Sequence, residues 1–167
     1  MSDKELEVSK ILQGDISIPY KERIQKVEDY IISISDNENA FGTGKEIIKP
    51  DFFKYKHSFA DGVYVREMRI EKGILLVGGI HKYKEVFFLL QGKLNIMTKE
   101  GVEEYIAPCY VIAPSGSKKM GYAVEECVVV TIHANPTNTE DIKELEDNMI
   151  VYSWKEYDEF LKNNKNE

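Results

Sequence analysis

The stretch "GILLVGGIHKYKEVFFLLQG", Gly73 to Gly92, contains one histidine, His81, and a glutamate four residues later, Glu85. Apolar runs flank these two residues, and short runs of this kind between glycines are typical of β-strands. The stretch therefore predicts a strand pair that carries an imidazole and a carboxylate. These two groups have three interpretations: a metal site, the remnant of a metal site, or two polar residues in an ordinary strand pair.

The same pattern continues on both sides of this stretch. From about residue 47 to 133, short runs rich in Val, Ile, Tyr and Phe alternate with Gly, Pro, Asp or Lys-Glu breaks. Many short strands at spacings of about 8–12 residues indicate a β-sandwich or barrel, and the long helical periods of a parallel α/β fold are absent. The predicted class is mainly β.

The two ends of the chain have helical patterns instead. Residues 18–35 place Tyr20, Ile24, Val27 and Ile31 at spacings of three and four, which favours an amphipathic helix packed on a domain face. Near the other end, Thr139 has the position of a helix cap, and Ser153 and Glu156 have capping-box spacing. The predicted organisation is a helical N-terminal arm (1–40), a β-barrel (41–135) and a C-terminal helical segment that packs on the barrel (136–167).

Composition limits the classes of function. The chain has 167 residues, 43% of them hydrophobic and 31% charged, which fits one globular domain. The net charge of -7 lies in the two ends, and residues 41–133 carry +2, so a basic stripe for nucleic acid is not expected. Two cysteines outside any CxxC pair favour a reduced setting, and neither a secretory leader nor a membrane span is expected. The expected location is the cytoplasm, with no membrane partner.

Two motifs carry a family resemblance. Gly73, His81, Glu85 and Gly92 have the spacing of the first cupin motif, in which two histidines, a glutamate and two glycines recur. After fifteen residues, a second segment from Pro108 to Ala123, "PCYVIAPSGSKKMGYA", resembles the second cupin motif. Residues 50–133 thus resemble the cupin superfamily, and in particular short cupin-domain proteins encoded by phages. The resemblance implies a single antiparallel jelly-roll barrel, a homodimer or higher homo-oligomer, and, in members that bind metal, three histidines and a glutamate around one ion.

The departures from these motifs concern the metal ligands. Gly79 has the place of the first histidine, Lys119 that of the second-motif histidine, and Ala123 that of the final asparagine. His81 and Glu85 alone are too few for a bound transition metal, and an ammonium group repels a cation. His133, on a late strand, is the replacement that would complete a metal set of His81, Glu85 and His133. His57 lies in a less regular segment and is a poorer candidate.

The remaining residues suggest a polar pocket inside the barrel, with a plain core containing a His–Glu hydrogen bond as the alternative. In an unbroken strand Tyr83, Phe87 and Leu89 would share the face of His81 and Glu85. The candidate ligand-binding residues are His81, Glu85, Lys119, Arg66, Tyr83, Phe87, Thr131 and His133, and no residue is assigned as catalytic.

The orientation of several of these residues has two interpretations. Arg66 is either an inward donor for phosphate or carboxylate or an exposed strand arginine. Residues 114–122, "PSGSKKMGY", read as a loop, so that Lys119 meets an anion or lies in a surface turn. Along "CVVVTIHA" (127–134), the set Val128, Val130 and Ile132 is interpreted as core. The alternate set with Thr131 and His133 then faces the pocket or solvent.

Three functions follow from these residues. The leading hypothesis is a non-catalytic cupin that binds a small anionic or nucleotide-like molecule without a cofactor, and phage analogy extends it to an anti-defence protein that sequesters a nucleotide signal. The alternative is a metal-dependent cupin enzyme, a dioxygenase or isomerase, that uses His81, Glu85 and His133. The third is an interaction or structural protein whose acidic helical ends make the contacts, with the N-terminal apolar stripe available for dimerisation.

Overall fold

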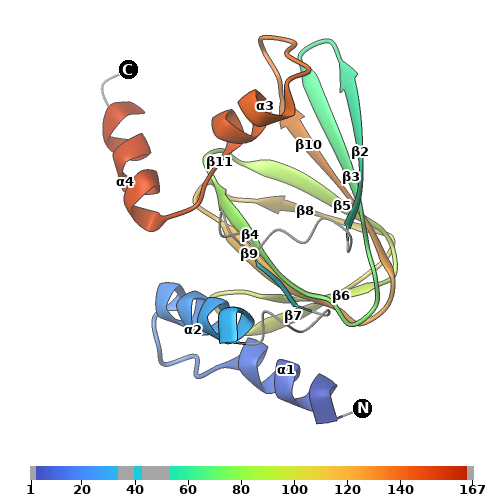
Figure 1. The fold of residues 1–167 in the computed structure, drawn as a ribbon, viewed down its shortest axis with the longest axis vertical. Helices are drawn as coiled ribbons and strands as arrows, with labels where there is room; N and C mark the ends of the chain where they lie inside the picture. Colours follow the sequence, from blue (N-terminus) through green and yellow to red (C-terminus); the bar gives the residue numbers. More distant parts are fainter. Residues whose placement is uncertain (1–2, 34–39, 43–52, 165–167) are drawn as a thin grey trace.

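The computed structural model describes residues 3–33, 40–42 and 53–164, and two β-sheets face each other at its centre (Figure 1). The N-terminal helices are α1 (Asp3–Gln13) and α2 (Tyr20–Ser33). The strands are β1 (Ala40–Gly42), β2 (Phe53–Ala60), β3 (Val63–Ile70), β4 (Leu75–His81), β5 (Glu85–Gln91), β6 (Lys93–Met97), β7 (Val102–Ile106), β8 (Cys109–Ala113), β9 (Lys118–Ala123), β10 (Cys127–Ala134) and β11 (Ile150–Val151). Helices α3 (Ile142–Met149) and α4 (Trp154–Asn163) flank β11 in the chain.

The strand order is that of a jelly roll. One sheet, called here the β9 sheet, has the order β1-β4-β9-β6-β7, with β11 paired to β4. The other, the β10 sheet, has the order β2-β3-β10-β5-β8. All pairings are antiparallel except that of β1 with β4, and from β3 to β10 the chain alternates between the sheets apart from the β6–β7 hairpin. The predicted mainly β jelly-roll fold is confirmed.

The first motif spans a crossover between the two sheets. His81 ends β4 in the β9 sheet, and Glu85 begins β5 in the β10 sheet, with a turn between them. The turn interrupts the alternation that an unbroken strand would have. Phe87 and Leu89 therefore lie inside the barrel, whereas Tyr83, in the turn, is 59% exposed. His81 and Glu85 thus lie where the chain crosses from the β9 sheet to the β10 sheet, at the barrel interior.

Three local predictions are wrong. Of the predicted core set in β10, only Val128 is buried, at 6% exposed, whereas Val130 is half-buried and Ile132 is 38% exposed. The reason is that β10 is a central strand with its other face, that of His133, inside the barrel. Residues 118–122 form β9 rather than a loop, since they pair with β4 and β6. His57 lies within the regular strand β2.

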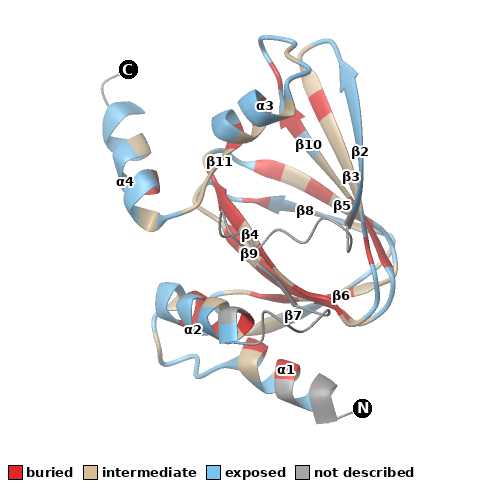
Figure 2. Cartoon of the chain, in the orientation of Figure 1, coloured by how far each residue is buried: buried red, intermediate tan, exposed pale blue. Residues whose placement is uncertain are grey.

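The N-terminal stripe packs on the outer face of the β9 sheet (Figure 2). Ile24, Val27 and Ile31 are at most 1% exposed and share one hydrophobic cluster with strand residues that include Val77 and Met120. The prediction of an amphipathic helix on a domain face is therefore confirmed. The alternative, that this stripe serves dimerisation, is wrong because the chain's own sheet covers it.

Polar contacts fix the same helix in place. The Tyr20 hydroxyl donates to the carbonyl of Lys118 at 3.0 Å, and the buried Lys118 ammonium pairs with Glu28 at 2.5 Å. Arg23 donates to the carbonyls of Thr98 and Lys99 in the β6–β7 turn. Helix α2 is thereby bonded to the strand residue directly before Lys119.

Both C-terminal helices begin at a capping residue. Helix α3 is capped by Asp141, whose carboxylate accepts from the amides of Lys143 and Glu144, and not by Thr139 as predicted. The capping box of Ser153 and Glu156 at the start of α4 is confirmed.

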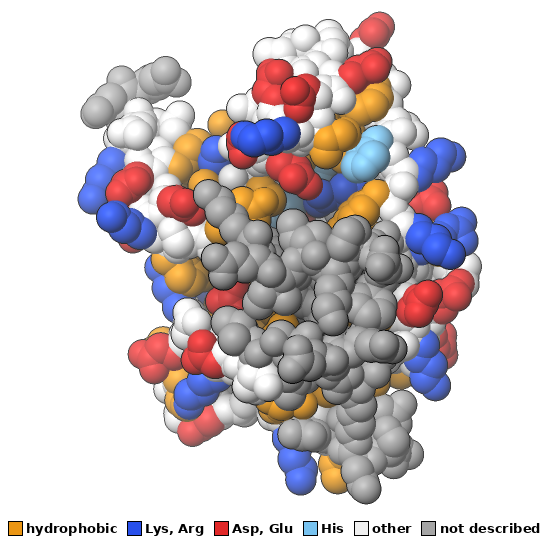
Figure 3. All heavy atoms as spheres, viewed as in Figure 1, with side chains coloured by type: hydrophobic (Ala, Val, Ile, Leu, Met, Phe, Trp, Pro, Cys, Tyr) orange, Lys and Arg blue, Asp and Glu red, His pale blue; other side chains and the backbone are white. Residues whose placement is uncertain are grey.

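The surface and the helices show two further features. No described helix is both long and apolar enough to span a membrane. On the described part of the face in Figure 3, acidic and basic side chains are interspersed.

Candidate functional site

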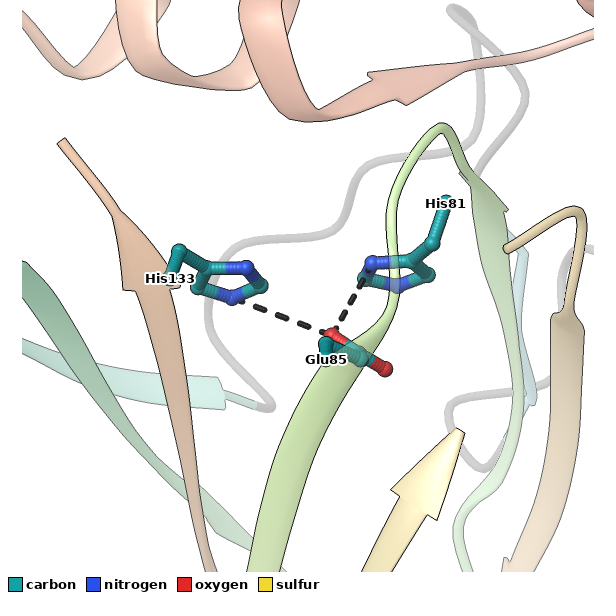
Figure 4. A group of neighbouring side chains, drawn as sticks. All are labelled: His81, Glu85 and His133. Atoms are coloured by element: carbon teal, nitrogen blue, oxygen red, sulfur yellow. Dashed lines mark ion pairs between the residues drawn. The ribbon is translucent and has the colours of Figure 1, made fainter. Parts of the chain in front are cut away.

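A carboxylate and two imidazoles meet inside the barrel. Glu85 lies between the rings of His81 and His133, which come from β4 and β10 (Figure 4). Glu85 Oε2 is 2.9 Å from His81 Nδ1 and 3.8 Å from His133 Nε2, and the two rings are stacked with centroids 6.0 Å apart. All three residues are buried, with exposed fractions of 3–8%. The motif pair is thus joined by the replacement residue that the sequence suggested.

Lys119 belongs to the same cluster. Its strand β9 directs the ammonium across the barrel, where Nζ forms an ion pair with Glu85 Oε1 and lies 4.8 Å from the centre of the Phe87 ring. The side chain is 22% exposed, and burial together with Arg66 lowers the pKa of Lys119 to about 7. A lysine amine that pairs with Glu85 therefore occupies the position that the resemblance assigns to a metal ligand.

Arg66 also lies on the inner face of its strand. Its side chain is 18% exposed, pairs with Glu146 of α3 at 3.6 Å, and has its guanidinium 5.9 Å from the Tyr55 ring. The interpretation of Arg66 as an exposed strand residue is therefore wrong. Its charge lowers the pKa of both imidazoles and of Lys119.

Both imidazoles of the cluster are neutral at physiological pH. Burial, followed by the charges of Lys119 and Arg66, lowers the pKa of His81 to about 3. Burial, then Arg66, His81 and Lys119, lowers the pKa of His133 to about 3. The nearby cations therefore oppose a further positive charge at these rings.

The neutral imidazoles predict that the fold is weakened by acid. Their pKa is about 3 in the folded protein, against 6.5 for an ordinary histidine. Between these values the unfolded chain binds more protons, so the free energy of unfolding should fall as the pH is lowered from 6.5 toward 3. Urea unfolding at about pH 7 and about pH 4.5 measures this loss. His133→Gln should show a smaller loss than the wild-type chain, and equal losses would contradict the neutral state of His133.

Four buried polar atoms on the inner faces of β5 and β10 lack hydrogen-bond partners within the described residues: both carboxylate oxygens of Glu85, Thr131 Oγ1 and His133 Nε2. The Glu85 oxygens form ion pairs with Lys119 and His81, which leaves Thr131 Oγ1 and His133 Nε2 without a hydrogen bond. An unsatisfied buried polar group costs about 1–3 kcal/mol, so such atoms favour a ligand or water that bonds to them. Both belong to the inward face of β10, which also presents Val129 to the core.

A cavity of about 450 Å³ opens beside the imidazoles. It lies at the end of the barrel that α3 covers, and its lining includes His81, Tyr83, His133, Asn135 and Met149. Tyr83 contributes at the surface, where its ring packs edge-on against Phe160 of α4. This volume lies within the ordinary range of small-molecule sites.

The Glu85 carboxylate and the two imidazoles also provide enough ligands for a metal ion. Ligand atoms of His81, Glu85 and His133 all lie within 4.8 Å of one another. Three protein ligands are the usual minimum for a catalytic transition metal, and these groups would hold one as a Lewis acid with open positions. The Lys119 ammonium opposes such an ion because it already balances the charge of Glu85.

Sequence reasoning missed Tyr64. This residue is fully buried on the inner face of β3, stacks on His133 at 5.9 Å, and has its hydroxyl 2.7 Å from His57 Nδ1. Its strand alternation placed it beside Arg66, but no motif position marks it. The ring forms one wall of the cluster and packs against Leu145 of α3.

No protein-family model matches the sequence, and no curated protein matches it. Among solved structures, a cupin-2 domain containing protein from Shewanella frigidimarina is similar, with a TM-score of 0.43 and 18% identity over 49% of this chain and 80% of that one. A cupin domain from Bordetella pertussis has a TM-score of 0.40 and 20% identity over 50% of this chain and 93% of that one. A putative ethanolamine utilization protein Q from Salmonella typhimurium has a TM-score of 0.45 and 15% identity over 54% of this chain and 74% of that one. These structural neighbours include cupin-domain proteins, and the likeness concerns the fold.

Proposed function

We propose that the protein binds a small anionic molecule inside its barrel without a metal. One observation carries the proposal: the Lys119 ammonium projects into the barrel interior beside Glu85, with Arg66 on the facing sheet. Each cation has a carboxylate partner, Glu85 for Lys119 and Glu146 for Arg66, and both cations still lower the pKa of both imidazoles. A partly desolvated ammonium surrounded by apolar walls favours a carboxylate or phosphate group.

The other groups of the cluster supply hydrogen bonds to the same ligand. Thr131 Oγ1 and His133 Nε2 have no hydrogen-bond partner among the described residues, and His133 Nε2 lies 3.8 Å from Glu85 Oε2. A neutral imidazole both donates and accepts. Glu85 accepts from hydroxyl or amino groups. An anion that also carries hydroxyl or amino groups satisfies all of these atoms, and nucleotides have this composition.

Thermal unfolding of chelator-treated protein tests the proposal. The panel consists of nucleoside mono- and triphosphates, cyclic nucleotides, aromatic carboxylates and inorganic phosphate. A ligand at about 100 times its Kd should stabilise the fold by about 2.7 kcal/mol, which raises the Tm by several degrees. A response confined to cyclic nucleotides would extend the proposal to sequestration of a nucleotide signal of host defence. No rise with any anion would contradict it.

The second candidate function is that of a metal-dependent enzyme. The convergence of His81, Glu85 and His133 within 4.8 Å favours it. Elemental analysis of protein purified without an affinity tag distinguishes the two candidates. About one transition metal per chain, lost in His81→Ala, would support the enzyme. Trace metal that is unchanged in His81→Ala would exclude it.

We further propose that two copies associate through β8. This strand is an edge of the β10 sheet, carries no charged residue, and exposes Tyr110 and Ile112 at 65% and 63%. The opposite edge, β2, carries Lys54 and Lys56, which discourage pairing. Two identical edges pair around a two-fold axis, and that symmetry makes a second copy the fitting occupant.

Ile112→Lys should therefore convert a dimer to a monomer in sedimentation velocity. The two introduced charges would face each other across the two-fold axis, and the interface would lose the apolar contact of Ile112. Lys54→Glu, on the opposite edge, is the matched control and should leave the dimer intact. A monomeric wild-type protein, or a dimer that survives Ile112→Lys, would contradict this interface.

A further inference from the structure

A second, larger cavity lies on the other side of the polar cluster. Its volume is about 850 Å³, and it is bounded by the start of α2, the β6–β7 hairpin, the β8–β9 loop and α4. The view in Figure 1 shows α2 and α4 on the same side of the barrel. We call this space the lateral cavity. Both helices lie outside the jelly roll, so the cavity forms where the helical segments pack beside the barrel.

Aromatic side chains from separate elements line the lateral cavity. They are Tyr20, Phe87, Tyr105, Trp154 and Tyr157. Phe87 and Tyr105 meet edge to face at 6.1 Å, and Trp154 and Tyr157 do the same at 6.4 Å. Tyr20 is fixed by hydrogen bonds from its hydroxyl to two strand carbonyls. The rings are thus held by the fold.

A glycine permits the approach of α4. A Cβ atom at Gly116 would lie 2.8–2.9 Å from the Tyr157 ring, and the φ angle there is +76°. Lys21 of α2 lies 4.4 Å from the Trp154 ring centre, which joins the two helices across the cavity. The wall that α4 contributes is therefore in close contact with both the barrel and α2.

The inner end of the lateral cavity reaches the polar cluster. Lys119 lines it, with its ammonium 4.8 Å from the Phe87 ring and in contact with Glu85. Phe87 is 2% exposed, so this end lies inside the barrel. Charged residues of both signs, such as Lys99 and Glu100, lie at the outer turn. One cavity thus combines a half-buried amine with aromatic walls.

We propose that the ligand is an aromatic anion: its ring lies in the lateral cavity and its anionic group contacts Lys119. The inference rests on the proposed function, because it takes Lys119 as the anion-recognition group. A flat ring gains stacking and edge contacts with the half-buried rings of Tyr20, Tyr105 and Trp154, which an alkyl chain does not. The volume of about 850 Å³ holds a drug-sized or nucleotide-sized molecule.

Fluorescence titration of the full chain with 8-anilinonaphthalene-1-sulfonate tests the inference, because this probe is itself an aromatic anion. One saturable site per chain is expected. Octanoate, an anion without a ring, and N-phenyl-1-naphthylamine, a ring compound without a charge, should each compete at least about tenfold more weakly than unlabelled aromatic sulfonate. Equal competition by octanoate would overturn the aromatic assignment.

Variants separate this inference from the proposed function. Trp154→Ala and Tyr105→Leu should each weaken probe binding at least about tenfold. Phe59→Ala, an aromatic position in β2 outside the cavity, should leave binding unchanged. Circular dichroism confirms that each variant is folded.

Two outcomes distinguish failure of the aromatic-site inference from failure of the proposed function. If Lys119→Met abolishes binding of the anions in the thermal panel while Trp154→Ala and Tyr105→Leu bind the probe normally, the lateral cavity is not the ring site, and the proposed function stands. If the aromatic variants lose the probe but Lys119→Met retains both the probe and the panel anions, Lys119 is not the anion group, and the proposed function fails.

Discussion

Lys119→Met should lower the affinity for an anionic ligand at least about 30-fold, because loss of one partner of a buried charge pair costs about 2–5 kcal/mol. The lysine is the cation that reaches into the barrel beside Glu85 and Phe87. Isothermal titration with the anion that raises the Tm most measures the effect. The same substitution removes the group that opposes a metal at Glu85. If the protein is instead the metal-dependent enzyme, Lys119→Met should increase its affinity for zinc.

Two further variants control this result. Lys119→Met alone leaves the Glu85 carboxylate buried without its counter-charge, which threatens the fold. The double variant Glu85→Gln/Lys119→Met removes both charges and should restore stability without restoring anion affinity. Lys93→Met removes a lysine that pairs with Glu104 and lines neither cavity, and it should keep the affinity. Full anion affinity in the double variant would refute the role of Lys119.

Gly92→Ala should destabilise the fold by at least about 2 kcal/mol, the largest stability effect expected from a single methyl group in this chain. Gly92 closes the first motif with a φ angle of +85°. A Cβ atom there would lie 2.1 Å from the carbonyl oxygen of Glu126, so the backbone of the β5–β6 link or of the β9–β10 turn would have to move. Urea unfolding measures the loss.

Gly73→Ala is the matched control for this prediction. Gly73 opens the same motif with a φ angle of +86°, but nothing within 4 Å would meet its Cβ atom. Only the backbone conformation is then strained, and the expected loss is about 1 kcal/mol. Equal losses for the two variants would mean that the contact with Glu126 has no energetic consequence.

The motif spacing predicted the fold because it reports backbone constraints. The glycines at 73 and 92 both have positive φ angles, and residues 81 and 85 lie at the crossover between the sheets. Such constraints depend on local sequence, so one chain suffices to detect them. The helical ends were predicted for the same reason, from periodicity and capping residues.

The arrangement of the site was less predictable because it depends on which face of each strand is inside. The apolar set of β10 predicts a core face, yet Ile132 is exposed, since the sheet's outer face is also apolar. The sequence favours an exposed Arg66 over an inward one, and the pairing with Glu146 of α3, which holds Arg66 inside, depends on the tertiary fold. The inward orientation of Lys119 was not predictable because it depends on the register of β9 against β4. The lateral cavity could not be foreseen, because its walls come from α2 and α4, which are far apart in sequence.

Native mass spectrometry of untagged protein, purified without added ligand or metal, tests the central claim most directly. The account predicts a small organic anion bound to the wild-type chain, absent from Glu85→Gln/Lys119→Met and still present after treatment with a chelator. A mass increase equal to one divalent metal ion per chain, with no organic species and lost on chelation, would contradict it.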